Sequence, residues 1–232
     1  MTKKNSTVNQ EELHKFSSIA DEWWDETGKF KPLHEINPVR LEYIIGQIKR
    51  NISKKEGITI LDIGCGGGLV SIPLSKVGYD VTGLDASSEN IKVAQSRNSK
   101  AKFICSSAEQ LCEEGNKYDV VLALEVVEHV DNIDLFLNSC VKLLKKNGIL
   151  IVSTINRTLK SLMFAKIGAE YVLGWLPKGT HQWDKFLTPT EVKSYVKTKV
   201  VDEAGMIYRP FSKKWEISDT DLSVNYFVTF RG

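Results

Sequence analysis

Along the middle of the chain, short continuous apolar runs alternate with segments whose apolar residues lie three or four positions apart. This pattern predicts a regular succession of strands and helices. Short apolar runs that end at turn signals predict buried strands at 58–63, 80–84, 102–105, 118–124 and 149–154. Runs with apolar residues three or four positions apart predict helices at 67–77, 87–98 and 131–144, with a short turn or helix at 106–113 between two of the strands. The alternation indicates an α/β fold with a doubly wound, mostly parallel sheet.

The N-terminal segment has helical spacing but lies outside this alternation. Residues 9–27 place Leu13, Phe16, Ile19 and the Trp23-Trp24 pair on one face of a predicted helix, and these large rings must pack on the main body or on a ligand. We expect a loop at 30–37 and a second helix that starts at Asn37-Pro38, with asparagine as the cap. Residues 1–51 would then form a helical cap.

The C-terminal part breaks the alternation with an insertion at 156–187. Its apolar positions have helical spacing and are flanked by lysines, so it would lie in a membrane interface, cover an apolar substrate pocket or be an ordinary covering helix. Thr188 and Glu191 form a capping box that opens a last helix. Strands at 200–209 and 223–230 would close the sheet as a hairpin, which makes seven strands in one domain of residues 1–232.

Composition narrows the class of protein. The 232 residues are 42% hydrophobic with a net charge of +2, so the chain can bury a core but offers no strong field for nucleic acid. Four cysteines, at 65, 105, 112 and 140, show no metal spacing, and we expect reduced core thiols in a cytosolic protein. No secretory signal and no apolar run of about 18 residues is present, so we expect no membrane span.

The first strand leads into a glycine-rich turn that is typical of a nucleotide-binding corner. Asp62 precedes Gly64, Gly66 and Gly68, and Asp85 ends the next strand, where a carboxylate can accept hydrogen bonds from both ribose hydroxyls. Leu69 stands where a dinucleotide fingerprint needs glycine. An S-adenosylmethionine (SAM) site therefore fits better than an NAD site, and a tight turn without a ligand is the plainer alternative.

Further candidate residues follow the third and fourth strands. Ala108 and Glu109 could contact an adenine edge. Glu125, Glu128 and His129 would share one face of a helical turn, where they could bind Mg²⁺ or Mn²⁺, supply a general base, or simply cap local backbone.

One further candidate lies near the start of the second helix. Arg40 could reach a carboxylate such as that of methionine, or it could be a solvated surface arginine.

With these motifs in place, the sequence resembles the class I SAM-dependent methyltransferases and, more closely, the ubiquinone biosynthesis O-methyltransferase family. The resemblance covers nearly the whole chain after residue 12. Its most specific segments are Asn37-Pro-Val-Arg40, Glu125-Val-Val-Glu-His-Val130 and Gly179-Thr-His-Gln-Trp183. The glycine loop and the segments at 20–25, 32–36, 81–87 and 224–227 agree with it.

The resemblance implies specific roles. Arg40, Gly64, Asp85 and Leu124 would line the SAM site, Leu124 standing where some relatives have methionine. Glu125, Glu128 and His129 match positions implicated in Mg²⁺ binding.

The resemblance also implies an acceptor and a place in the cell. The acceptors would be a polyprenyl catechol and 3-demethylubiquinol, each methylated on a ring hydroxyl, with His129 or Glu128 as base or metal ligand. We expect a cytoplasmic protein associated peripherally with the inner face of the membrane through residues 158–178, with other ubiquinone-pathway enzymes as further partners. Another small phenolic acceptor, an NAD-linked oxidoreductase and a lipid-surface scaffold are the alternatives.

Overall fold

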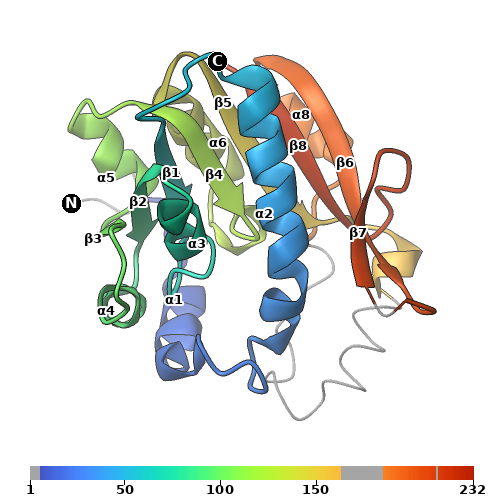
Figure 1. Cartoon of the computed structure of the whole chain (residues 1–232), viewed down its shortest axis with the longest axis horizontal. Helices are drawn as coiled ribbons and strands as arrows, with labels where there is room; N and C mark the ends of the chain where they lie inside the picture. Colours follow the sequence, from blue (N-terminus) through green and yellow to red (C-terminus); the bar gives the residue numbers. More distant parts are fainter. Residues whose placement is uncertain (1–5, 163–184, 213) are drawn as a thin grey trace.

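An eight-stranded mixed sheet forms the centre of the computed structural model, which describes residues 6–162, 185–212 and 214–232 (Figure 1). The helices are α1 (Gln10–Ser17), α2 (Lys31–Asn51), α3 (Ser71–Lys76), α4 (Ser88–Gln95), α5 (Ala108–Glu113), α6 (Ile133–Lys142) and α8 (Pro189–Tyr195), with 3₁₀ turns η2 (Ala20–Glu22) and η3 (Val127–His129). The strands are β1 (Thr59–Ile63), β2 (Asp80–Asp85), β3 (Lys102–Cys105), β4 (Tyr118–Leu124), β5 (Leu144–Ile155), β6 (Lys199–Arg209), β7 (Lys214–Ser218) and β8 (Asn225–Arg231).

The strand order β3-β2-β1-β4-β5-β8-β6-β7 confirms the predicted doubly wound sheet. Strands β1 to β5 pair in parallel, and β8 pairs antiparallel with both β5 and β6. The predicted count of seven strands is one too low, because β7 pairs antiparallel with the far edge of β6. The carboxyl ends of the parallel strands face the side of the molecule where α1 lies (Figure 1).

Helices cover both faces of the sheet, so successive residues of one strand belong to different cores. On one face, α2 and α3 pack against alternate strand residues such as Ile60, Leu122 and Ile151. On the other face, α5, α6 and α8 pack against residues such as Leu61 and Val121. Burial on both faces explains the continuous apolar run Val120–Leu124 in β4 and the apolar Ile60, Leu61 and Ile63 in β1.

Two N-terminal boundaries differ from the prediction. The expected helix at 9–27 ends at Ser17 and continues only as the short η2 turn, which lets Trp23 turn toward the sheet. The expected loop at 30–37 is wrong, because α2 already begins at Lys31 and runs through Pro38. The buried side chain of Phe30, just before the helix, anchors this earlier start.

The end of the α6 helix also differs from the prediction. The helix covers Ile133–Lys142 rather than the predicted 131–144, and Leu144 already belongs to β5. The predicted capping box of Thr188 and Glu191 is confirmed at the start of α8.

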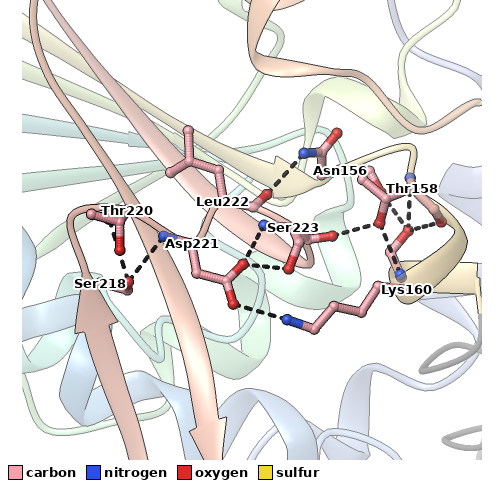
Figure 2. A network of polar contacts seen from close by, with 9 residues as sticks. Asn156, Thr158, Lys160, Ser218, Thr220, Asp221, Leu222 and Ser223 are labelled. Carbon is pink, nitrogen blue, oxygen red and sulfur yellow. Dashed lines mark hydrogen bonds and ion pairs between the residues drawn. The ribbon is translucent and has the colours of Figure 1, made fainter.

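A polar network fastens the start of the insertion to the loop between β7 and β8 (Figure 2). Thr158 Oγ1 donates to the carbonyl of Ser223 at 2.6 Å, and Lys160 Nζ donates to Asp221 Oδ2 at 2.8 Å. Most of the predicted insertion, at 163–184, lies outside the described residues. The network therefore fixes where the insertion leaves the sheet.

The four cysteines are free thiols, and Cys65 and Cys140 are buried as expected. Cys105 is exposed at the end of β3, so the expectation that it is a core thiol is wrong. Within the described part of the chain, no helix has both the length and the hydropathy that crossing a bilayer requires.

Candidate active site

The glycine loop after β1 is shaped by close contacts that only glycine permits. Gly64 and Gly66 have φ values of 71° and 52°, in the left-handed region that favours glycine. A Cβ atom on Gly64 would lie 2.3 Å from Val126, and one on Gly66 would lie 2.2 Å from the Trp23 ring. The amide of Gly66 donates to Asp85 Oδ2 at 2.9 Å, which ties the loop to the end of β2.

The Asp85 carboxylate sits among three donors from this corner of the sheet. Besides Gly66, the amide of Ser87 donates to its Oδ1 at 2.8 Å and Asn90 Nδ2 donates at 3.2 Å. Burial raises the pKa of Asp85, while the Ser87 and Gly66 amides lower it. Each carboxylate oxygen has two lone pairs, so the site retains acceptor capacity for the hydroxyls of a ribose.

The Trp23 side chain packs against the glycine loop. Its indole N–H donates to Asn90 Oδ1 at 2.8 Å, and its ring stacks on Phe30 with centroids 3.9 Å apart. Trp24 donates to the carbonyl of Gly67 at 2.9 Å. Trp23 packs on the main body, which was one of the two alternatives for the tryptophan pair, and it also lines the two cavities described below.

Arg40 on α2 is a buried cation that lies close to the glycine loop and Glu125. Its side chain is 5% exposed and lies 3.4 Å from Glu125 Oε1, yet its Nε and Nη2 atoms make no hydrogen bond. Buried guanidinium donors without partners are uncommon in folded proteins, and they suit a ligand carboxylate. Of the two alternatives for Arg40, the solvated surface arginine is therefore wrong.

Asp62 lies at the end of β1 as a buried carboxylate. Ser71 Oγ donates to its Oδ2 at 2.5 Å. Burial raises its pKa to about 6, and the Asp85 charge adds to this, while Ser71 and Arg40 oppose it. A ligand cation at this place would restore the charged form of Asp62.

Glu125 and Glu128 face different surroundings. Glu125 has a φ of 53°, rare for a residue with a side chain, and this turn directs its carboxylate to Arg40 and to Ser153 Oγ, which donates at 2.9 Å. Glu128 is 6% exposed, and its Oε2 has no hydrogen-bond partner. Burial and the neighbouring Glu125 charge raise the pKa of Glu128 to about 8.

His129 ends the 3₁₀ turn and contacts the N-terminal helix. Its Nδ1 lies 2.9 Å from Glu12 Oε2, and the Phe16 ring meets the imidazole edge-on with centroids 5.2 Å apart. Across the described residues, no three His, Cys, Asp or Glu side chains are grouped so that they could hold a metal ion. The arrangement of Glu125, Glu128 and His129 in this structure therefore does not fit the expected Mg²⁺ site.

Two cavities meet at these residues. The first, of about 160 Å³, includes Asp85, Ala86, Asn90 and the strap of residues 7–16 in its lining. The second, of about 280 Å³, is largely apolar and includes Phe30, Leu33, Ile36 and Trp215 beside the charged groups. The residues that line both are Phe16, Trp23, Gly64, Glu125 and His129.

Most of the sequence-predicted site residues converge here. Arg40, Asp62, Gly64, Leu124, Glu125, Glu128 and His129 line the larger cavity, and Asp85 lines the smaller one. Ala108 and Glu109 line neither: Ala108 is in the core, and Glu109 Oε1 accepts the Thr7 amide at 2.8 Å.

Sequence reasoning missed Glu12 and Asn90 as site residues. Glu12 and its partner His129 are 117 positions apart in the sequence, so no local spacing signals their contact.

Comparisons with known proteins agree with this geometry. Residues 61–152 match the family described as "Methyltransferase domain". The magnesium protoporphyrin IX methyltransferase of Synechocystis, solved with SAH, has 18% identity and a TM-score of 0.59 over 97% of this chain and 89% of its own. A SAM-dependent methyltransferase of Thermotoga maritima has 16% identity and a TM-score of 0.64 over 94% of this chain and 99% of its own.

Curated relatives are much more similar. A ubiquinone biosynthesis O-methyltransferase of Dinoroseobacter shibae is 46% identical over 97% of each chain. The mitochondrial protein of that name from Arabidopsis thaliana is 45% identical over 98% of this chain and 75% of its own.

The parallel sheet, the glycine loop and the acid that ends β2 define a class I SAM-dependent methyltransferase. SAM is its methyl donor. Within that class, the identity over nearly the full length shows that the chain belongs to the ubiquinone biosynthesis O-methyltransferase family.

Proposed function

We propose that this enzyme transfers a methyl group from SAM to a ring hydroxyl of a polyprenyl catechol and of 3-demethylubiquinol. The observation that carries the proposal is the larger cavity, which combines apolar walls with the buried carboxyl of Glu128 and with His129. An aromatic ring with an apolar tail suits those walls, and a phenolic hydroxyl suits the polar groups at one end. The names of the curated relatives support this acceptor class.

The residues around the glycine loop would hold the methyl donor. Arg40 would pair with the methionine carboxylate through its unpartnered N–H groups, and Asp62 would face the ammonium group. Asp85 would accept from the ribose hydroxyls, while the amides of Gly64 and Gly66 keep the loop in place. When bound there, SAM would supply an electrophilic methyl group through its sulfonium.

The protein must remove a proton from the acceptor, because a phenol has a pKa of about 10 and only the phenolate is a strong nucleophile. Glu128 and His129 both line the acceptor cavity, and we assign proton removal to this pair. Phe16 and Trp23 line both cavities, and so they would exclude water from the reacting atoms.

An acceptor panel tests the proposal. Initial rates with labelled SAM are compared for a short-tailed polyprenyl catechol, for 3-demethylubiquinol with the same tail, and for catechol without a tail. We expect the prenylated acceptors to have the higher kcat/KM. Equal or higher kcat/KM for tail-free phenols would contradict it and would favour a small phenolic acceptor. Glu128→Gln and His129→Ala should each lower kcat, with the affinity for SAH retained.

The Mg²⁺ ion expected from the sequence is a separate proposal, and no step above passes through it. To bind it, Glu125 would have to leave its contacts with Arg40 and Ser153. Turnover with Mg²⁺ and with excess chelator decides this question. Loss of turnover in chelator, restored by Mg²⁺, would support the ion, and unchanged turnover would exclude a requirement for it.

We further propose a cytoplasmic, one-domain enzyme that sits on the inner face of the membrane through residues 158–178 and contacts other ubiquinone-pathway enzymes there. Among the described residues, Leu159 is 75% exposed and Phe211, between β6 and β7, is fully exposed, which supports an apolar contact surface. Deleting residues 160–176 should abolish co-sedimentation with liposomes and leave SAH affinity intact. Full liposome binding after the deletion would contradict the assignment.

A further inference from the structure

A strap of residues 7–16 lines the smaller cavity and is hydrogen-bonded to the turn that carries His129. Val8 forms an antiparallel bridge with Val130, and the amide of Asp131 donates to the carbonyl of Thr7 at 2.9 Å. Asn9 Nδ2 donates to Asp131 Oδ1 at 2.6 Å. These contacts hold α1 in a defined place relative to the 3₁₀ turn.

Asn9 then links this anchor to Glu12. Its Oδ1 accepts the Glu12 amide at 2.9 Å, so the same side chain caps α1 and bonds to Asp131. The Glu12 carboxylate lies 2.9 Å from His129 Nδ1, and both side chains are less than a fifth exposed. A short contact that is so well anchored restricts the rotation of the imidazole.

A carboxylate at Nδ1 has a defined chemical consequence for histidine. It favours the tautomer with the proton on Nδ1, which leaves the lone pair on Nε2. Because the two nitrogens occupy different corners of the ring, fixing Nδ1 on Glu12 also fixes the direction of Nε2. His129 lines both cavities, so this direction matters at the point where acceptor and methyl donor meet.

We propose that Glu12 is a positioning residue of the methyl-transfer site, and that it acts by orienting the His129 ring and fixing its tautomer. The inference rests on the proposed role of His129 in the reaction. It makes the N-terminal helix part of the reaction centre as well as a cover for the cofactor.

Three variants separate this role from simple packing. Glu12→Ala removes the contact, and Glu12→Gln keeps an oxygen that can accept from Nδ1. Glu11→Ala is the matched control, because Glu11 is the exposed neighbour in the same helical turn. We expect Glu12→Ala to lower kcat by roughly tenfold or more, Glu12→Gln to restore most of it and Glu11→Ala to leave it unchanged. The affinity for SAH should change less than kcat does.

A double-mutant cycle with His129→Ala gives the decisive comparison. If Glu12 acts through His129, the double variant Glu12→Ala/His129→Ala has the same kcat as His129→Ala alone. The proposal would be overturned if Glu12→Ala lowered kcat as much in the His129→Ala background as in the parent enzyme. Glu12 would then act independently of His129. An unchanged kcat in Glu12→Ala would also overturn it.

A measurement that needs no turnover tests the role of Glu12 independently of the proposed function. Imidazole ¹⁵N shifts of His129, assigned by their absence in His129→Ala, should show the Nδ1-protonated form in the full chain and its loss in Glu12→Ala. The same ring state in both proteins would refute the inference even with an active enzyme. If the parent enzyme transfers no methyl group to the prenylated catechol, the proposed function is wrong. The tautomer of His129 still tests the proposed role of Glu12.

Discussion

Asp62→Asn should stabilise the ligand-free enzyme and weaken its binding of the methyl donor. The pKa of Asp62 is about 6, against an ordinary value of 3.8, because burial disfavours its charge. A pKa that is raised in the folded state means that ionisation costs stability. This loss of stability is absent at pH values below the pKa of the aspartate in the unfolded chain. It is complete at pH values above the pKa of Asp62 in the folded protein. A difference of about 2 pH units at about 1.4 kcal/mol each makes the full cost about 3 kcal/mol.

Urea unfolding of both proteins at two pH values measures this cost. Linkage predicts that ionisation of Asp62 lowers the free energy of unfolding by about 1.6 kcal/mol at about pH 5 and by about 3 kcal/mol at about pH 7.5. The advantage of Asp62→Asn in free energy of unfolding should therefore grow by about 1.4 kcal/mol between them. An advantage that does not change with pH would refute the argument that burial of the charge is the cause.

Binding of SAH to the same two proteins should show the converse dependence. A cationic ligand group holds Asp62 ionised, so the affinity of the parent enzyme should fall about tenfold from about pH 7.5 to about pH 5. Asp62→Asn should bind more weakly near neutral pH and should lose most of this dependence. Calorimetric titration checks it, and an equally steep pH dependence in Asp62→Asn would assign the effect to another group.

Other sites give sharper structural tests. Gly66→Ala places a Cβ 2.2 Å from the Trp23 ring at a φ of 52°, so SAH binding should be lost, as calorimetry would show. Gly205→Ala places a Cβ 1.8 Å from the carbonyl oxygen of Asp221, and thermal unfolding should show destabilisation by about 1–3 kcal/mol. Lys160→Gln removes a partly exposed ion pair with Asp221 and should cost less than about 1 kcal/mol in the same assay.

The sheet was largely predictable because its central strands β1, β4 and β5 are mostly buried. The predicted strand bounds at 102–105 and 118–124 agree with β3 and β4, whose ends coincide with turn signals. The sequence Lys214–Ser218 was not predicted as a strand, because β7 lies at the sheet edge and has only two apolar residues in five. Edge strands with this pattern carry a weak hydrophobic signal.

Local sequence rules failed where tertiary contacts overrode them. Asn37-Pro38 has the form of a helix start, yet the Asn37 side chain donates to the carbonyl of Leu69 at 2.7 Å and the helix continues through the proline. Burial of Phe30 and Ile36 outweighs the hydrogen bond that Pro38 cannot donate.

The candidate site was predictable to the extent that it lies at strand ends. Asp62, Asp85 and Glu125 lie at the carboxyl ends of parallel strands, which share one edge of the sheet. The side-chain directions were not predictable, because Glu125 has a positive φ and its carboxylate contacts Arg40 and Ser153 from distant segments. Such a conformation depends on surroundings that distant segments supply.

The identity of the methylated atom tests the central claim most directly. The enzyme is incubated with SAM that carries a labelled methyl group and with a short-tailed polyprenyl catechol, and the product is analysed by mass spectrometry and NMR. The account predicts one labelled methyl group on a ring oxygen and an equal amount of SAH. Tight binding of SAH with no methylated catechol, or a label on carbon, would contradict it.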